Sequence, residues 1–129
     1  MENDFKIWLV RAKSSLKISK TRIDEDILYE DLCFQAQQAV EKALKGLLIF
    51  YNVEPEKTHN LVTLIKELSK YTEVPEEINE TAILNDYAVQ TRYPGEYTPI
   101  NEDEYYNAIM ITEKCVSWVD KKINELLKK

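Results

Sequence analysis

The chain has 129 residues, a mass of 15.2 kDa and a formal net charge of −6 at pH 7, so we expect one domain over residues 1–129. Hydrophobic residues make up 44% of the sequence, whereas it holds only two glycines and four prolines, a composition that excludes sandwiches and barrels and favours a few long helices. The negative charge also argues against non-specific affinity for nucleic acid.

The first expected helix covers about residues 3–20. Its inward positions recur every three or four residues, as one buried stripe requires: Phe5, Trp8, Leu9, Ala12, Leu16 and Ser19. Another face carries Lys6, Lys13, Lys17 and Lys20. This basic face is either a solvated surface that complements the acidic remainder of the chain or a docking surface for RNA or an acidic partner.

The strongest helical pattern covers about residues 27–51, and Asp24 or Asp26 is expected to cap it. Its apolar arc is broad and has alanines at its centre, which predicts neighbours on more than one side: Leu28, Leu32, Ala36, Ala39, Ala43, Leu47 and Phe50. Gly46 lowers helix propensity by about 1 kcal/mol relative to alanine. We therefore expect another helix to cross closely at Gly46.

The segment QAQQAVEKALK of this helix carries Gln37, Glu41 and Lys45 at a spacing of four, which places the three side chains on one face. One interpretation is an ordinary polar face with a Glu–Lys pair. The other is a nucleotide contact, in which the amide meets a base and the ammonium meets a phosphate.

A third helix is expected from about residues 59–61 to Tyr71, with Thr58 as its cap. His59 is the one histidine of the sequence and stands at this helix start, where we expect it to cap the helix or to be exposed. A single histidine can also act as a general base. The sequence contains no GxSxG, HExxH or phosphate-binding glycine loop that would indicate other catalytic chemistry.

A fourth helix is expected to begin with Pro75 in its first turn, followed by Glu76 and Glu77 at the positive end of the helix dipole. Its predicted apolar side consists of Ile78, Ala82, Ile83, Tyr87 and Ala88. We expect it to end near Tyr93, because Pro94 disfavours the helical conformation in the residue before it.

The stretch RYPGEYTP follows, and its Pro94-Gly95 pair fits the centre of a type II turn. Such a turn holds Arg92 at a helix end and returns Tyr97 towards it. The stretch is either a structural corner or a ligand site, in which the Arg92 guanidinium contacts phosphate and Tyr93 and Tyr97 contact a base.

The last helix has the clearest start signal, because Asn101 and Glu104 form a variant capping box that Ile100 and Tyr105 flank as a hydrophobic staple. Its stripe comprises Tyr105, Ile109, Thr112, Val116, Val119, Ile123 and Leu127. The acids at 102–104 suit the helix dipole and lack the spaced partners of a metal site. Five helices and no strand predict an all-α, up-and-down antiparallel bundle of four to five helices.

Cys33 and Cys115 both fall within apolar helical patterns, so we expect buried free thiols in a reducing compartment rather than a disulfide. The longest apolar run, LLIFY, is too short to span a bilayer. The opening MENDFKIWLVRAK has no signal-peptide pattern. We therefore expect a cytoplasmic protein without membrane association, metal or cofactor.

The segment LCFQAQQAVEKALKGLLIFYNVEPEKTHNLVTLIKEL, followed by TRYPGEY and a long final helix, resembles the HEPN domain, a family named for nucleotide binding in higher eukaryotes and prokaryotes. The resemblance covers about residues 3–127. It implies a four- to five-helix up-and-down bundle that is commonly a homodimer. It also implies a small nucleotidyltransferase as partner, often in a toxin–antitoxin pair with a ribonuclease toxin.

Ribonuclease members of the family carry an arginine, a spacer of four to six residues and then a histidine, and two copies cleave RNA without a metal. Arg92 matches the arginine by context, but Tyr97, Thr98 and Pro99 stand where the histidine is expected. Because this motif supplies no imidazole to move a proton, the resemblance implies binding of a nucleotide or RNA end rather than cleavage.

The residues implied in that binding are Arg92, Tyr93 and Tyr97, with Gln37, Glu41 and Lys45 lining the facing helix. One alternative is a metal-independent endoribonuclease with a divergent site, in which Arg92 works with Tyr97 or His59. The other alternative is a protein–protein interaction module.

Overall fold

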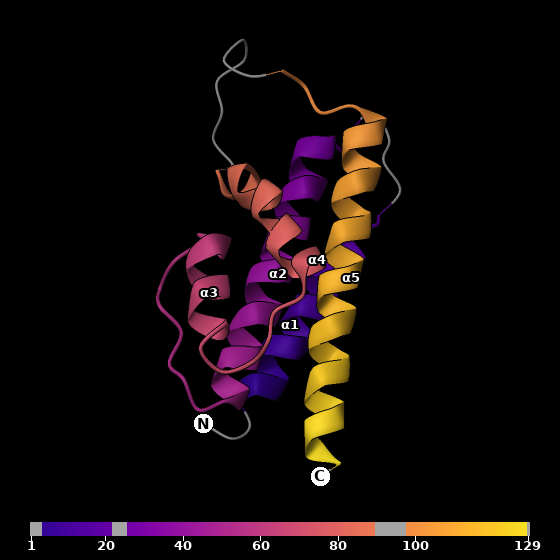
Figure 1. Cartoon of the computed structure of the whole chain (residues 1–129). Helices are drawn as coiled ribbons and strands as arrows, with labels where there is room; N and C mark the ends of the chain where they lie inside the picture. Colours follow the sequence, from indigo (N-terminus) through magenta and orange to yellow (C-terminus); the bar gives the residue numbers. More distant parts are fainter. Residues whose placement is uncertain (1–3, 22–25, 90–97, 129) are drawn as a thin grey trace.

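The computed structural model describes residues 4–21, 26–89 and 98–128 (Figure 1). The helices in these ranges are α1 (Asp4–Ser19), α2 (Tyr29–Phe50), α3 (Leu61–Leu68), α4 (Glu76–Asn79), the 3₁₀ helix η1 (Glu80–Ala88) and α5 (Glu102–Leu127). Since η1 continues α4, these segments correspond to the five expected helices, and the described ranges contain no strand. The predicted all-α bundle is confirmed.

The central helix of the bundle is α2, which packs against α1, α3, η1 and α5. Ala36, Ala39 and Ala43 are fully buried, and their small side chains let neighbouring helices approach on more than one side, as predicted. Buried leucines such as Leu44 and Leu47 each contribute roughly 1.5–3 kcal/mol through removal from water. Leu28, predicted as the first member of the arc, is instead 55% exposed because it precedes the first helical turn.

The predicted close crossing at Gly46 is also confirmed. A β-carbon added to Gly46 would lie 3.2 Å from Trp8 Cβ and 3.5 Å from the Phe5 carbonyl oxygen. The helix α1 therefore passes so near to α2 that even a β-carbon at position 46 would require Trp8 to shift by a few tenths of an ångström.

Two predicted helix caps are wrong. Leu28, not Asp26, is the N-cap of α2, and its side chain makes no cap hydrogen bond; Asp24 lies outside the described residues. Asn60, not Thr58, caps α3, because Asn60 Oδ1 accepts from the Val62 N–H at 3.0 Å. Thr58 Oγ1 instead accepts from the Asn60 N–H at 3.0 Å. Thr58 therefore holds the backbone of the capping residue and does not itself bond an N–H of α3.

The inward face of the fourth helix differs from the prediction because the helix changes type. Its buried residues are Ile78, Thr81 and Leu84, a spacing of three that matches the three residues per turn of a 3₁₀ helix. Ile83, placed inward by the α-helical period, is 57% exposed. The Thr81 hydroxyl is satisfied by donating to the Ile78 carbonyl at 2.6 Å.

This helix also ends earlier than predicted. Ala88 is the last residue of η1, and Val89 already has an extended backbone, with φ −90° and ψ 103°. The helix therefore stops before the segment in which Pro94 was expected to end it, and residues 90–97 lie outside the described residues.

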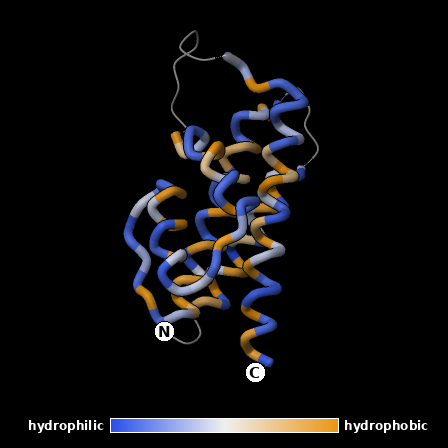
Figure 2. Tube along the Cα trace, viewed as in Figure 1, coloured by the Kyte–Doolittle hydropathy of each residue, from blue (hydrophilic) through white to orange (hydrophobic). Residues whose placement is uncertain are grey.

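The last helix, α5, begins as predicted: Asn101 Oδ1 accepts from the Glu104 N–H at 2.8 Å. Figure 2 shows hydrophobic and hydrophilic positions alternating along α5, as one buried stripe requires. The Tyr105 hydroxyl donates to the Ser19 carbonyl at 2.5 Å and so joins α5 to the end of α1. Leu127, predicted as the last inward residue, is 58% exposed, because the last turn of α5 extends past the neighbouring helices (Figure 1).

The two cysteines are fully buried and free, as predicted. Burial raises the pKa of both the Cys33 and the Cys115 thiol to about 12. Within the described ranges, no group of three or more histidine, cysteine, aspartate or glutamate side chains is placed so that it could hold a metal ion. None of the helices there combines the length and apolarity needed to cross a membrane.

Candidate functional site

A group of polar side chains surrounds the carboxylate of Glu41 on α2. Glu41 Oε2 lies 3.1 Å from Lys45 Nζ, and Glu41 Oε1 lies 2.8 Å from His59 Nδ1. The amide nitrogens of Gln37 and Gln38 both lie 3.4 Å from the same Oε1. We refer to these five residues as the Glu41 cluster.

Most of the Glu41 cluster is buried. The side chains of Glu41 and Lys45 are 5% and 10% exposed, and Gln37 is completely buried. Ionised groups removed from water must be paired to be tolerated, and the described residues leave no buried side-chain nitrogen or oxygen without a hydrogen-bond partner. The cluster is therefore an internally satisfied network.

The path of the chain after α2 brings His59 to the cluster. Asn52, with a positive φ of 63°, reverses the chain just beyond Phe50, a conformation that asparagine tolerates better than most residues. Glu41 lies nine residues, or about 13 Å, before the end of α2. The segment from Asn52 to His59 spans at most about 25 Å and can run back along α2 over that distance. Gln37 Nε2 then donates to the His59 carbonyl at 2.9 Å and fixes the segment.

His59 is the exposed member of the cluster. Its side chain is 72% exposed, whereas that of its partner Glu41 is 5% exposed. Because a carboxylate can only accept, Nδ1 of the ring carries the proton and donates to Glu41. A neutral ring held in this way presents Nε2 as an acceptor, and a charged ring presents Nε2–H as a donor.

A hollow of about 240 Å³ adjoins His59 and is lined by His59, Asn60, Asn85 and Ala88. Asn85 Oδ1 accepts from the Leu61 N–H at 2.8 Å, and Asn85 Nδ2 donates to Asn60 Oδ1 at 3.1 Å. The volume is below the roughly 300–1,000 Å³ of typical ligand pockets. The hollow by itself therefore matches one phosphate group or part of a base rather than a whole nucleotide.

The cluster is also joined to α1 through Trp8. Lys45 Nζ lies 5.7 Å from the centre of the Trp8 ring, and the Arg11 guanidinium lies 5.8 Å from it. Both distances fall within the range of cation–π attraction. The Lys45 ammonium thus has two favourable neighbours, the Glu41 carboxylate and the Trp8 ring.

The structure brings four predicted candidates together, namely Gln37, Glu41, Lys45 and His59. His59 is exposed, as expected, but it does not cap α3, and its pairing with Glu41 was not predicted. Lys45 and Gln37 use their polar atoms within the chain, so His59 offers the more accessible group for a ligand.

The remaining candidates, Arg92, Tyr93 and Tyr97, lie outside the described residues. Ala88, which lines the hollow, stands two positions before residues 90–97 in the sequence. The amides of Asn60 and Asn85 were missed by sequence reasoning. Only the THN triplet at the start of α3 gave a signal for Asn60, because asparagine is a favoured N-cap residue.

Known proteins resemble this chain in both sequence and fold. The HEPN domain matches residues 5–123 of the chain. The structure of TT1696 from Thermus thermophilus superposes with a TM-score of 0.79 at 29% identity, over 95% of this chain and 99% of that one. ST0689, an archaeal HEPN homologue, superposes with a TM-score of 0.73 at 28% identity, over 92% and 97% of the two chains. No curated protein matches the sequence.

Proposed function

The chain belongs to the HEPN domain family, and on that premise we propose that it binds a nucleotide or an RNA end where His59 emerges from the Glu41 cluster. The observation that carries this proposal is the exposed imidazole, 72% accessible, held at 2.8 Å by a carboxylate that is almost completely buried. In binding sites, buried residues commonly hold a ligand-contacting side chain in a fixed orientation, as the Glu41 cluster holds the His59 ring.

The chemistry of the hollow suits a nucleotide. A charged His59 donates to a phosphate oxygen through Nε2, and the N–H donors that Asn60 and Asn85 keep beyond their own hydrogen bonds meet acceptors on part of a base. Arg92 supplies a bidentate phosphate contact, and Tyr93 and Tyr97 supply rings on which a base stacks.

The buried residues act behind this surface. Glu41 orients the His59 ring and fixes its tautomer, Lys45 neutralises the carboxylate, and Gln37 holds the backbone of His59 at 2.9 Å. In this proposal their effect on binding passes through His59 and not through direct contact with the ligand.

Isothermal titration calorimetry tests this function with AMP, ATP and a 5′-phosphorylated RNA tetramer. We expect His59→Ala and Arg92→Ala each to weaken binding at least about tenfold, since each removes a charge-assisted hydrogen bond of about 1.5–3 kcal/mol. Lys66→Ala, an exposed site on α3, is the control and should leave the affinity unchanged. No binding at millimolar ligand, or equal affinity of all variants, contradicts the proposal.

The same geometry favours a second candidate function, a metal-independent endoribonuclease. A carboxylate that holds Nδ1 of an imidazole leaves Nε2 to act as a general base. On RNA, Nε2 of His59 takes the proton of the 2′-hydroxyl, the 2′-oxygen attacks the phosphorus, and the 5′-oxygen leaves and takes a proton from water. The products are a 2′,3′-cyclic phosphate and a 5′-hydroxyl.

Incubation of a labelled RNA with the protein in EDTA distinguishes the two candidates. Cleavage that is lost in His59→Ala and reduced in Glu41→Gln, while Lys66→Ala cleaves normally, establishes the ribonuclease. Intact RNA together with His59-dependent affinity establishes binding without cleavage.

The oligomeric state and partner are part of the proposal as well. We infer a cytoplasmic homodimer that works beside a small nucleotidyltransferase in a toxin–antitoxin-like pair, and the support for this is membership of the family. Light scattering of the purified chain gives the mass of the assembly, and co-expression with the neighbouring gene product tests the pairing.

A further inference from the structure

The outward face of α1 carries three exposed apolar side chains. Ile7, Val10 and Ile18 are 50%, 68% and 46% exposed, although a surface helix normally carries polar residues opposite its buried stripe. We call these three residues the α1 stripe. No described segment of the chain covers them.

The arrangement of the stripe follows from helix geometry. At about 100° per residue, Ile7, Val10 and Ile18 fall within an arc of about 80°. The buried Phe5 and Ala12 lie on the opposite side of the helix. The stripe is therefore a second face, separate from the buried one, in which the exposed Ser14 lies between Val10 and Ile18.

Basic side chains border the stripe on both edges. Lys6, Lys13 and Lys17 lie along one edge and Arg11 along the other, by the same spacing. Asp4 is the single acid in Asp4–Ser19, whereas the whole chain has a net charge of −6. This helix is thus a local positive surface on an acidic protein.

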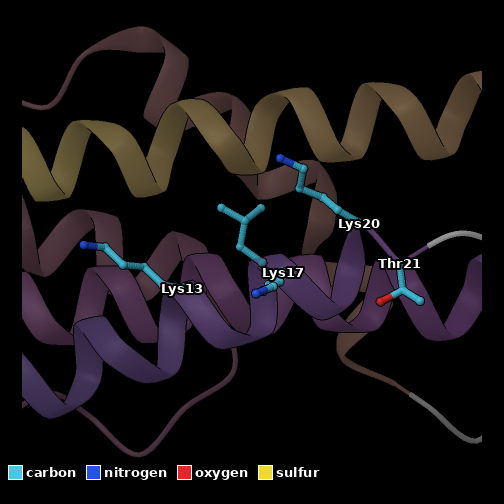
Figure 3. Close-up of a pocket in the computed structure, with 5 residues that line it drawn as sticks. Lys13, Lys17, Lys20 and Thr21 are labelled. Atoms are coloured by element: carbon cyan, nitrogen blue, oxygen red, sulfur yellow. The ribbon is translucent and has the colours of Figure 1, made fainter.

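A hollow of about 430 Å³ adjoins the lysine edge, lined by Lys13, Leu16, Lys17, Lys20 and Thr21 (Figure 3). Lys13 pairs with Asp120 at 3.0 Å and Lys20 pairs with Glu113 at 2.9 Å, both on α5. In the part of the chain that the structure describes, no carboxylate lies within 4.0 Å of Lys17 Nζ. Lys17 therefore offers an ammonium for a partner's acid beside the stripe.

We propose that the α1 stripe and this hollow form a docking surface for an acidic amphipathic helix of another protein. Apolar residues of that helix cover Ile7, Val10 and Ile18, and its flanking carboxylates meet Lys17, Lys6 and Arg11. An amphipathic helix laid along an apolar surface with complementary charged edges is a recurring mode of peptide recognition.

Charge complementarity favours this occupant over others. A second copy of α1 would bring basic edges against basic edges, which costs affinity. RNA would gain from the lysines but not from three exposed aliphatic side chains. The stripe lies on α1, whereas the proposed ligand hollow is lined by residues just before α3 and on η1, so each proposal can fail without the other.

Fluorescence anisotropy tests the docking surface with two labelled synthetic helices of about 18 residues, long enough to match α1. Both carry leucines at every third or fourth position, one with glutamates and the other with lysines beside them. We expect the acidic helix to bind at least about tenfold more tightly than the basic one and to weaken as salt rises.

Exposed-site variants locate the contact, and circular dichroism confirms that they fold. We expect Val10→Ser and Lys17→Glu each to weaken the acidic helix about fivefold or more. Ile83→Ser and Lys66→Glu, matched changes at exposed positions on η1 and α3, should leave it unchanged.

Three results overturn the proposal. In the first, neither synthetic helix binds the protein, or both bind equally well. In the second, Val10→Ser and Lys17→Glu leave binding of the acidic helix unchanged. In the third, the α1 stripe is covered by something other than an acidic helix. The last would appear as a homodimer dissociated by Val10→Ser in light scattering, or as co-sedimentation with anionic phosphatidylserine vesicles that Val10→Ser abolishes.

Discussion

Replacing Glu41 by glutamine removes the charge at the centre of the Glu41 cluster with almost no change in shape. The Lys45 ammonium, on a side chain only 10% exposed, then loses its carboxylate. Breaking a buried ion pair by removing one partner costs about 3–5 kcal/mol. The Trp8 ring, 5.7 Å from Lys45 Nζ, offsets about 0.5–2 kcal/mol of that loss.

The expected destabilisation by Glu41→Gln is therefore about 1–4.5 kcal/mol. The contact between Glu41 and His59 adds little to this figure, because the imidazole is 72% exposed and is screened by water. A domain of this size is stable by roughly 5–15 kcal/mol, so the loss is a large fraction of the total but still leaves a folded protein.

Urea denaturation followed by circular dichroism in the far ultraviolet measures this loss. The matched control is Glu67→Gln, which removes the carboxylate from the pair with Lys70 at 3.2 Å, where the lysine side chain is 66% exposed. That exposed pair should cost no more than about 1 kcal/mol. The double variant Glu41→Gln/Lys45→Met removes both buried charges and should recover stability relative to Glu41→Gln alone, with a coupling of about 0.5–3 kcal/mol.

Two results would refute this reasoning. The first is a free energy of unfolding of Glu41→Gln within about 0.5 kcal/mol of that of the parent chain, a difference no larger than the usual departure from additivity. The Glu41 carboxylate would then not be the buried partner of Lys45. If the effects of Glu41→Gln and Lys45→Met were additive, the two residues would not interact.

Three further predictions concern the bundle itself. Gly46→Leu should destabilise the fold by at least about 1–3 kcal/mol, because its side chain meets Trp8 on α1; an unchanged thermal midpoint would rule out the close crossing. Asn101→Ala should cost about 1 kcal/mol through loss of the α5 cap, measured by urea denaturation, and a loss below about 0.3 kcal/mol would show that the cap is dispensable. The pKa of the Cys33 and Cys115 thiols is raised from 9.0 to about 12, so the folded state binds their protons more tightly than the unfolded chain does, and this contribution to stability is complete below about pH 9 and is lost as pH rises towards 12. Native protein at about pH 8 should therefore resist a disulfide reagent that modifies both thiols in urea. Rapid modification of the native protein would contradict the burial of the thiols.

The long helices could be predicted because their apolar residues repeat with the α-helical period and because local signals mark some of their ends. Gly46 is the best example, since a glycine inside a strong helical pattern has a cost that a close helix crossing explains. The cap of α5 at Asn101 was equally readable, because capping depends only on residues within one turn.

The change of helix type at residues 80–88 could not be predicted. Thr81 is polar and so does not read as an inward position, and an inward spacing of three residues is also compatible with an α-helix. The helix η1 packs against α2, α3 and α5, and a local sequence pattern does not reveal such tertiary contacts. Leu127 shows a related limit, since periodicity tells which face is apolar but not where the neighbouring helices end.

The pairing of His59 with Glu41 joins residues 18 positions apart, and it depends on how the segment after Asn52 runs back along α2. The sequence places Gln37, Glu41 and Lys45 on one face because the helical period does so. It contains no local signal that a histidine from the following segment reaches that face.

The most direct test of the central claim is the affinity of a 5′-phosphorylated RNA tetramer for the parent chain and for His59→Ala, measured by calorimetry. If His59 is the ligand-contacting group of the Glu41 cluster, His59→Ala binds at least about tenfold more weakly. Its stability should change by less than about 1 kcal/mol, because the ring is mostly exposed. Equal affinity of the two proteins would contradict the account.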